Sequence, residues 1–101
     1  MTSTGWLYLI RCTLFAYYKI GVCQITPEAR LKVLQTGCPF PLNLIKAIEC
    51  RDIHGAESYL HSYFSQWRQG GEWFLFDSNT LKEVEAKMDH MALFYRITEV
   101  A

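Results

Sequence analysis

The chain has 101 residues, which is enough for one domain with a single buried core. Hydrophobic residues make up 50% of the sequence and aromatic residues 15%, and this composition excludes an intrinsically disordered chain. Ten basic residues balance ten acidic ones, so the chain does not fit a protein that holds nucleic acid by net charge alone.

We expect no membrane-spanning segment and no signal peptide. No stretch is long and apolar enough to span a membrane, and the N-terminus lacks the basic and then apolar pattern of a signal peptide. We therefore expect a cytoplasmic protein. The four cysteines are too widely spaced for C-x-x-C motifs, and we expect reduced thiols because cytosolic disulfides are rare: Cys12, Cys23, Cys38 and Cys50.

The N-terminal part of the chain predicts a strand hairpin. Residues 6–12 are apolar at almost every position, which indicates a strand buried on both faces, and residues 17–23 predict a second strand that pairs with it. Tyr8 points to one side of the first strand, and Lys19 lies on the second strand. Gly21 inside a strand indicates a bulge or a close approach of another group to the backbone.

A helix and a third strand follow. Thr26 and Pro27 predict the helix start, as an N-cap followed by proline at the first helical position. Gly37 is expected to end this helix. After a rigid, proline-containing link, residues 42–50 predict a third strand.

Residues 53–68 predict a helix with a carboxylate at the border of its buried face. The apolar stripe at helical spacing consists of Ile53, Ala56, Leu60, Phe64 and Trp67. Glu57 borders this stripe, and at about 100° per residue Arg68, His61 and His54 share its helix edge. An unpaired buried charge is costly, so Glu57 needs a partner, and a metal ion, an arginine and solvent remain open.

The rest of the chain predicts a turn at Gly70-Gly71, a strand at Trp73–Phe76 and a last helix over about residues 80–95 that starts at a Thr80/Glu83 capping box. Its packing stripe is Leu81, Val84, Met88, Met91 and Tyr95. The order β-β-α-β-α-β-α predicts an α/β (α+β) fold, a small mixed or antiparallel sheet of three to four strands flanked by helices. Residues 1–101 are expected to form one domain.

Several short motifs occur in the order and spacing of a known nuclease superfamily. They are Trp6-Leu7-Tyr8, Lys19-Ile20-Gly21, Thr26-Pro27-Glu28-Ala29-Arg30-Leu31, Ala56-Glu57-x-x-Leu60-His61-x-x-Phe64 and Gly71-Glu72-Trp73-Phe74. Over about residues 5–77 the chain resembles the GIY-YIG nucleases. It is similar to a phage- and prophage-associated branch of that superfamily, which commonly reads KIG in place of YIG.

The resemblance implies an endonuclease that hydrolyses phosphodiester bonds in DNA with a divalent metal ion. Tyr8 would accept the proton of the attacking water or orient that water. Arg30 would clamp the phosphate, and Glu57 would hold Mg²⁺ or Mn²⁺. Lys19, in the place of the YIG tyrosine, would lower the pKa of Tyr8 or contact the phosphate.

Two further residues of the 53–68 helix are expected near the substrate. His61 would support Glu57 or contact the phosphate, and Arg68 would bind the substrate. An alternative for His54, Glu57 and His61 is a transition-metal site, because their i, i+3, i+7 spacing places them along one helix edge and imidazole favours Zn²⁺.

Ordinary structural roles remain open for the same residues. Tyr8 would be a core aromatic, Arg30 a surface cation, Glu57 one half of a structural ion pair, and Lys19 a strand-edge charge. The asparagine of the family has no clear match, and Asn79 is the candidate. The alternative function is therefore a weak or inactive module that binds nucleic acid or a protein. RNA as substrate, a homodimer and a separate recognition partner also remain open.

Overall fold

The computed structural model describes the backbone of residues 3–95 and the side chains of residues 3–92. In chain order its elements are β1 (Gly5–Cys12), β2 (Tyr17–Cys23), α1 (Pro27–Thr36), β3 (Leu42–Cys50), α2 (Ile53–Tyr63), the 3₁₀ helix η1 (Ser65–Trp67), β4 (Arg68–Gly70), β5 (Trp73–Leu75) and α3 (Ser78–Tyr95). The α+β class predicted from the element order is confirmed.

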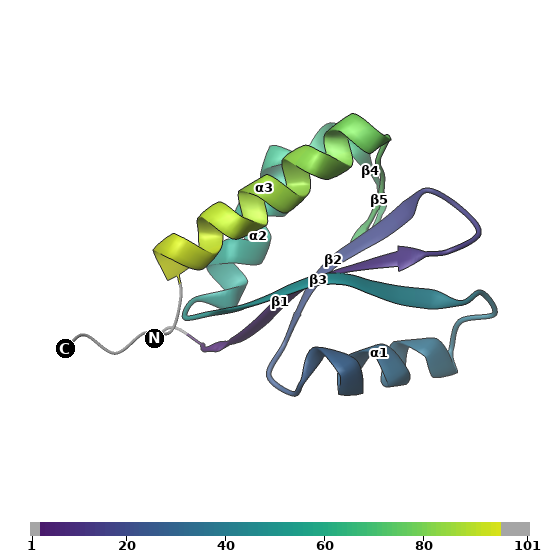
Figure 1. The fold of residues 1–101 in the computed structure, drawn as a ribbon, viewed down its shortest axis with the longest axis horizontal. Coiled ribbons are helices and arrows are strands. Elements are labelled where there is room, and N and C mark those ends of the chain that lie inside the picture. The colour runs from purple at the N-terminus through teal and green to yellow at the C-terminus, as the bar shows by residue number, and fades with distance from the viewer. Residues whose placement is uncertain (1–2, 96–101) are drawn as a thin grey trace.

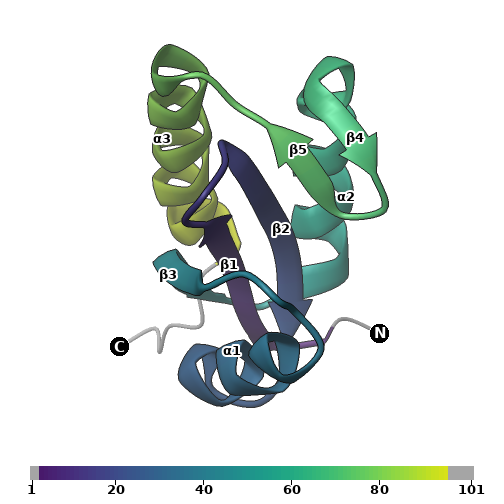
Figure 2. The same ribbon diagram turned by 90° about the vertical axis from the view of Figure 1, so that its right-hand side faces the viewer.

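The strands form one antiparallel sheet in the order β3-β1-β2-β5-β4. The sheet thus has five strands rather than three or four, and the predicted β1–β2 hairpin is confirmed. Leu7 and Leu9 of β1 pack with α2 and α3, whereas Tyr8 and Ile10 pack with α1. Figures 1 and 2 show α2 and α3 on one side of the sheet and α1 on the other. β1 is therefore buried on both faces, as its apolar sequence indicates.

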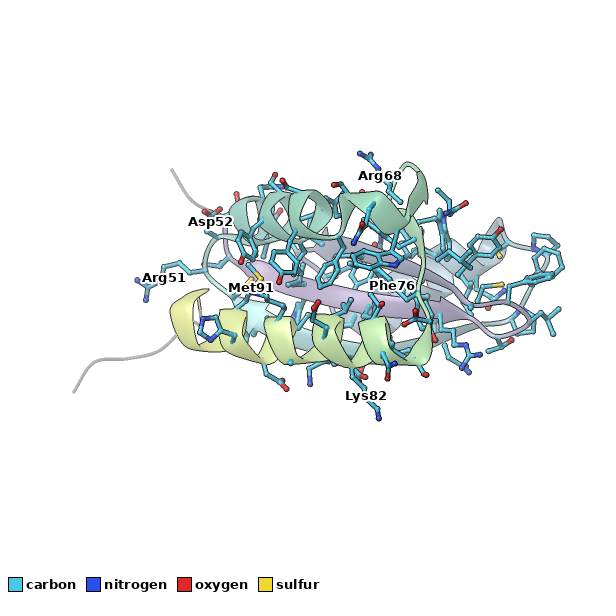
Figure 3. All side chains as sticks on the ribbon, turned by 90° about the horizontal axis from the view of Figure 1, so that it is seen from above. Arg51, Asp52, Arg68, Phe76, Lys82 and Met91 are labelled. Carbon is cyan, nitrogen blue, oxygen red and sulfur yellow. The ribbon has the colours of Figure 1, made fainter. Side chains whose placement is uncertain are left out.

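The prediction of one helix over residues 53–68 is wrong at its C-terminal end. α2 ends before Phe64, and a 3₁₀ turn leads the chain into β4. Tertiary packing explains the difference, because the rings of Phe64 and Trp67 pack against Phe76 and β4 pairs with β5 instead of continuing the helix. Arg68 therefore lies on a strand, and Figure 3 shows its side chain pointing away from the body of the protein.

The start of the last helix also differs from the prediction. Asp77, not Thr80, caps α3, since the backbone N–H of Thr80 donates to Asp77 Oδ1 over 2.7 Å. This bond lowers the pKa of the Asp77 carboxyl. A carboxylate is also favoured at the positive end of the helix dipole. Glu83 consequently lies inside the helix rather than in a capping box with Thr80.

Asp77→Ala is expected to lower the free energy of unfolding, because the side-chain cap of α3 is lost. Urea denaturation followed by circular dichroism measures this change. Thr80→Ala is the matched variant and keeps the backbone N–H that Asp77 binds. A loss of stability in Thr80→Ala without one in Asp77→Ala would contradict the assignment of the cap.

The packing of α3 follows its predicted stripe. Val84, Met88 and Met91 are buried against the sheet and α2, and Figure 3 shows Met91 and Phe76 between α2 and α3. The side chain of Tyr95 lies outside the described residues. All four cysteines are free thiols. No helix within residues 3–95 has the length and apolar character needed to cross a membrane.

Candidate active site

The candidate site lies at the edge of the sheet where β5 stops. β5 pairs with β2 only over Tyr17–Lys19. At the next residue, the Ile20 N–H donates to the backbone carbonyl of Glu72 over 3.2 Å, and the Ile20 carbonyl lies 2.8 Å from Nε2 of His61. From Gly21 onward no strand within residues 3–95 pairs with this edge of β2, so side chains from both faces of the sheet can meet there.

Tyr8 lies over Gly21, its partner across the β1–β2 ladder. A Cβ atom on Gly21 would stand 2.6 Å from Cζ of Tyr8 and 2.9 Å from Oε1 of Glu72. The close approach that a glycine inside a strand predicts is therefore confirmed. The missing side chain lets the Tyr8 hydroxyl and the Glu72 carboxylate come together above β2.

Arg30 reaches the Tyr8 hydroxyl from the first turn of α1. This turn forms where the sequence predicts it, with the Ala29 N–H bonded to Thr26 Oγ1 over 3.2 Å and proline at the first helical position. The guanidinium donates a hydrogen bond to the Tyr8 hydroxyl, which raises the pKa of Arg30. Arg30 Nε is buried and, within the described residues, has no hydrogen-bond partner.

The pKa of Tyr8 is raised, because burial of the phenol outweighs the opposing bond from Arg30. This direction is opposite to the lowering that we expected from Lys19. The Lys19 ammonium instead pairs with Glu72 over 2.8 Å, and its side chain is 13% exposed. Lys19 thus neutralises and positions a carboxylate, while Arg30 is the cation that contacts Tyr8.

Glu57 approaches the same edge from α2, on the opposite face of the sheet from α1. Burial raises the pKa of the Glu57 carboxyl, and so do the charge of Glu72 and a hydrogen bond to Glu72. The charges of His61 and His54 act in the opposite direction and lower this pKa. Glu57 Oε2 is buried without a hydrogen-bond partner among the described atoms. The neighbour of Glu57 is therefore a second carboxyl, that of Glu72. Within the described residues, no ion pair joins Glu57 to Arg30 or to Arg68, the two predicted arginine partners.

Two carboxyl groups in hydrogen-bond contact need a proton or a cation between them. Glu57 and Glu72 offer hard oxygen ligands, and the unpartnered Oε2 of Glu57 leaves one oxygen free for an ion. Such a pair fits Mg²⁺ or Mn²⁺, because Mg²⁺ commonly takes one or two carboxylates and completes its shell with water and phosphate oxygens. Among the side chains of residues 3–92, no three His, Cys, Asp or Glu are grouped so that they could hold a metal ion.

The three-residue alternative of His54, Glu57 and His61 is not assembled. His54 is exposed, and Nε2 of His61 is engaged by the backbone of β2. The His61 ring also contacts Phe74 edge-on, with centroids 5.1 Å apart. His61 therefore fixes the end of the β2 edge beside Glu57.

Arg68 and Asn79 lie apart from this cluster. The Nε of Arg68 donates to the Gly71 carbonyl over 2.6 Å, so Arg68 holds the turn that carries Glu72. Gly71 has a φ of +56°, a left-handed conformation that favours glycine and shapes this turn. Asn79 is exposed in the first turn of α3.

Glu72 is the site residue that sequence reasoning missed. It occurs in one of the family motifs, but no role was assigned to it. A signal existed in the opposite charges of Lys19 and Glu72, since such pairs form between neighbouring strands. Using that signal requires knowing that β5 pairs with β2, which the strand patterns alone do not specify.

Gly21→Ala is expected to displace the Tyr8 ring, which is only 1% exposed and has little room to move. We expect a loss of about 1–3 kcal/mol in the free energy of unfolding, as for other overpacked sites, together with a loss of any activity that needs the Tyr8 hydroxyl. Gly37→Ala is the control, because a Cβ atom there meets no atom within 4 Å. Equal stability of the two variants would show that Tyr8 does not lie over Gly21.

Glu57→Gln is expected to raise the melting temperature of the metal-free protein at neutral pH. Because the folded-state pKa of Glu57 is raised, the stability from its protonated form is complete below the ordinary value of 4.5 and is lost as the pH rises through the folded-state pKa. Glutamine removes this titration, so the advantage of the variant should vanish at low pH. Thermal unfolding across that range tests this, and a variant less stable than wild type at neutral pH would contradict it.

Comparison with known proteins identifies the family. The T5orf172 domain matches residues 5–89, which include every residue of the cluster described above. No curated protein and no solved structure matches the chain significantly. Because the match spans most of the chain, from β1 into α3, the protein belongs to the T5orf172 domain family, a phage-associated family.

Proposed function

We propose that this domain is a metal-dependent endonuclease of the GIY-YIG type that hydrolyses phosphodiester bonds in DNA. The T5orf172 family is compatible with a nuclease-like or DNA-binding module. The observation that supports hydrolysis is the pair of buried, unpartnered atoms Arg30 Nε and Glu57 Oε2 in one cluster. An unsatisfied buried polar group costs about 1–3 kcal/mol, and a phosphate at Arg30 with a cation at Glu57 would satisfy both.

In this proposal Arg30 binds the phosphate group next to the bond that is cleaved. The planar guanidinium offers several N–H donors, and the Tyr8 bond occupies only part of this set. A charge-assisted contact with phosphate oxygens orients the substrate over β2. Because Arg30 also touches Tyr8, the phosphate and the tyrosine hydroxyl are brought side by side.

Tyr8 then acts on the attacking water through its hydroxyl. The raised pKa keeps the phenol protonated at neutral pH, so its oxygen orients the water by hydrogen bonding, and it accepts the water's proton only as the pH approaches the raised pKa. The guanidinium of Arg30 stabilises the phenolate that this transfer would produce.

Glu57 and Glu72 would hold a divalent ion, with Lys19 beside Glu72 and His61 beside Glu57 as positioning residues. The chemistry that a bound Mg²⁺ or Mn²⁺ supplies is charge neutralisation at the phosphate and at the leaving oxygen. Lys19 limits the negative charge of the carboxylate pair when no ion is present. His61 fixes the backbone at Ile20, next to Gly21 and the Tyr8 ring.

Nicking of supercoiled plasmid DNA tests the proposal. Wild-type protein is incubated with Mg²⁺, with Mn²⁺ and with EDTA, and single-stranded, duplex and branched DNA are tested in parallel. Cleavage that requires the divalent ion is the expected result. The absence of metal-dependent cleavage on all of these substrates would overturn the enzymatic proposal.

A second candidate function is a catalytically weak or inactive module that binds nucleic acid. The ion pair between Lys19 and Glu72 favours it, because an ammonium bound to the carboxylate competes with a metal ion. Lys19→Ala separates the two proposals. If the ion pair blocks a metal, the variant gains metal-dependent cleavage; if Lys19 positions Glu72 for an active enzyme, the variant loses it.

A further inference from the structure

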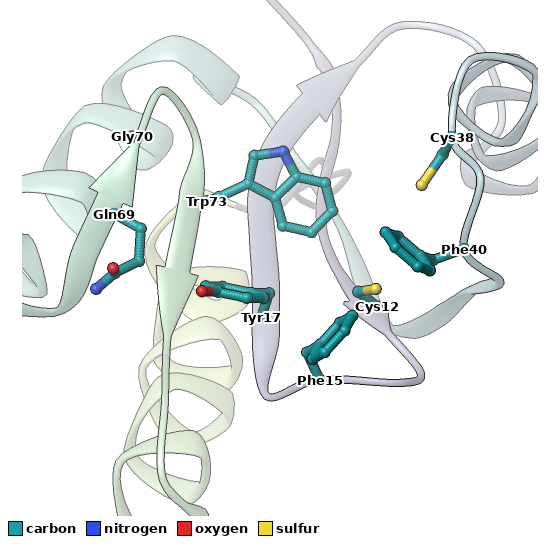
Figure 4. A pocket seen from close by; sticks show the side chains of 8 residues that line it. All are labelled: Cys12, Phe15, Tyr17, Cys38, Phe40, Gln69, Gly70 and Trp73. Carbon is teal, nitrogen blue, oxygen red and sulfur yellow. The ribbon is translucent and has the colours of Figure 1, made fainter.

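An aromatic hollow of about 430 Å³ lies on the same face of the sheet as Tyr8. Its aromatic walls come from Phe15 in the β1–β2 turn, Tyr17 in β2, Phe40 in the link before β3, and Trp73 in β5. Figure 4 shows these four rings around one opening, with Gln69 and Gly70 of β4 at the left, beyond Tyr17 and Trp73. The size falls within the roughly 300–1,000 Å³ of small-ligand sites.

Three of the four rings are exposed, whereas Trp73 is partly buried and packs against the core cluster that contains Tyr8. Phe15 is 47% exposed, Phe40 is 38% exposed and Tyr17 is 37% exposed. Phe15 and Phe40 meet edge to face, with centroids 5.4 Å apart and ring planes at 88°. Leu14, in the same turn, is 61% exposed. A cluster of exposed apolar side chains of this kind marks a binding surface.

The aromatic hollow shares two lining residues with a neighbouring hollow that reaches Lys19, the partner of Glu72. Trp73 and Cys38 also line a second hollow of about 420 Å³, whose wall includes Lys19. The Lys19 ammonium lies 5.7 Å from the centre of the Trp73 ring and pairs with Glu72. Trp73 is the first residue of β5 and directly follows Glu72 in the chain. The start of β5 therefore places the Glu72 carboxylate in the candidate active site and the Trp73 ring in the wall of the hollow.

We propose, on the basis of the nuclease function proposed above, that the aromatic hollow binds unpaired nucleobases of the DNA strand whose phosphate lies at Arg30. Aromatic side chains bind single strands by stacking on base faces, whichever base is present. In a duplex those faces are covered by neighbouring base pairs. The substrate is therefore a single strand, or the unpaired part of a frayed or branched DNA.

The charge balance of the chain bears on how this occupant is held. The chain has no net charge, so it does not fit a protein that binds nucleic acid by charge alone. Stacking supplies affinity that does not depend on net charge. At the rim, Gln69 Nε2 donates to the Trp67 carbonyl over 3.4 Å, and no described atom lies within 4 Å of the position of a Cβ on Gly70.

Fluorescence anisotropy with a short labelled single strand, in EDTA to prevent cleavage, tests the proposal. Wild type is compared with Phe15→Ala and Phe40→Ala, and Tyr59→Ala is the control, since Tyr59 is an aromatic residue of α2 that is 45% exposed. We expect roughly fivefold or greater weakening with each phenylalanine variant and none with the control. The duplex of the same sequence should bind more weakly than the single strand. Thermal melting checks that each variant is folded.

Several outcomes would overturn the proposal. The first is that wild type and both phenylalanine variants bind the single strand with equal affinity. The second is that wild type binds the duplex as tightly as the single strand. The third is that Phe15→Ala or Phe40→Ala changes the oligomeric state without changing the DNA affinity. The last result would assign the hollow to a second copy of the chain.

The same oligonucleotide incubated with Mn²⁺ separates this proposal from the nuclease proposal. If the phenylalanine variants bind and cleave it like wild type, the hollow proposal fails and the nuclease proposal stands. If they lose binding while wild type binds but does not cleave, the hollow retains its ligand and the nuclease proposal fails.

Discussion

Glu57→Gln is expected to lower the rate of metal-dependent DNA cleavage by about 10³-fold or more, while the protein stays folded. The substitution keeps the size of the side chain and removes its charge. In the proposed mechanism it would also remove a ligand oxygen from the pair formed with Glu72, and the phosphate would lose its neutralising ion. Single-turnover cleavage in Mg²⁺ and in Mn²⁺ measures the effect.

The control for this prediction is Glu83→Gln, an exposed glutamate in α3 that lies outside the cluster. It removes the same charge from the protein and should cleave like wild type. If Glu57→Gln cleaves as well as Glu83→Gln, the activity belongs to another site or to a contaminant. If metal-free Glu57→Gln is also more stable than wild type, as expected above, then the Glu57 carboxylate lowers the stability of the fold while it supports cleavage.

Tyr8→Phe is expected to lower the cleavage rate by about 10²–10⁴-fold, which is the usual contribution of a positioned acid or base. The ring continues to fill its place between β1 and α1, and Arg30 remains available to the phosphate. DNA affinity should therefore change little. A KM effect without a rate effect would place Tyr8 among the binding residues instead.

The pH profile tests how Tyr8 acts. Because its pKa is raised, the fraction of phenolate grows with pH throughout the neutral and mildly alkaline range. A wild-type rate that climbs with pH, and a flatter profile in Tyr8→Phe, indicates proton transfer to the phenolate. Tyr18→Phe is the control, since Tyr18 packs on the other face of the sheet, in the core beneath α2 and α3. Loss of activity in that variant would contradict the β1–β2 register.

The sequence was most informative where structure is local. The apolar run of β1 predicted a central strand, and Thr26-Pro27 predicted the start of α1, because both signals depend on neighbouring residues alone. Gly21 in β2 predicted a close approach of another group. Side-chain alternation then placed Tyr8 on one face of the sheet, where α1 brings Arg30 to it.

Sequence reasoning failed where distant segments compete. Residues 64–68 carry a helical apolar pattern, yet ring packing around Phe76 and pairing between β4 and β5 end α2 early and carry Arg68 away from Glu57. The same pairing brings Glu72 to β2, so the missed site residue and the misplaced arginine have one cause. No pattern within residues 64–76 contains this information.

The expected effect of Lys19 on Tyr8 failed for a related reason. The β1–β2 register places Lys19 opposite Ile10, on the Tyr8 face of the sheet. Its charge is taken up by Glu72, a residue whose position depends on the β4–β5 hairpin. Burial raises the pKa of Tyr8, and knowing which face of the sheet a side chain lies on does not tell how deeply it is buried.

Paramagnetic broadening by Mn²⁺ in the ¹⁵N-labelled protein tests the central claim most directly, because it locates a metal ion without requiring cleavage. At low Mn²⁺ the amide signals of Gly21, Glu57 and Glu72 are predicted to broaden first, and Glu57→Gln is predicted to remove this pattern. Broadening centred elsewhere, for example at the exposed Glu83 and Asp89 of α3, would contradict the account, and so would the absence of any localised effect.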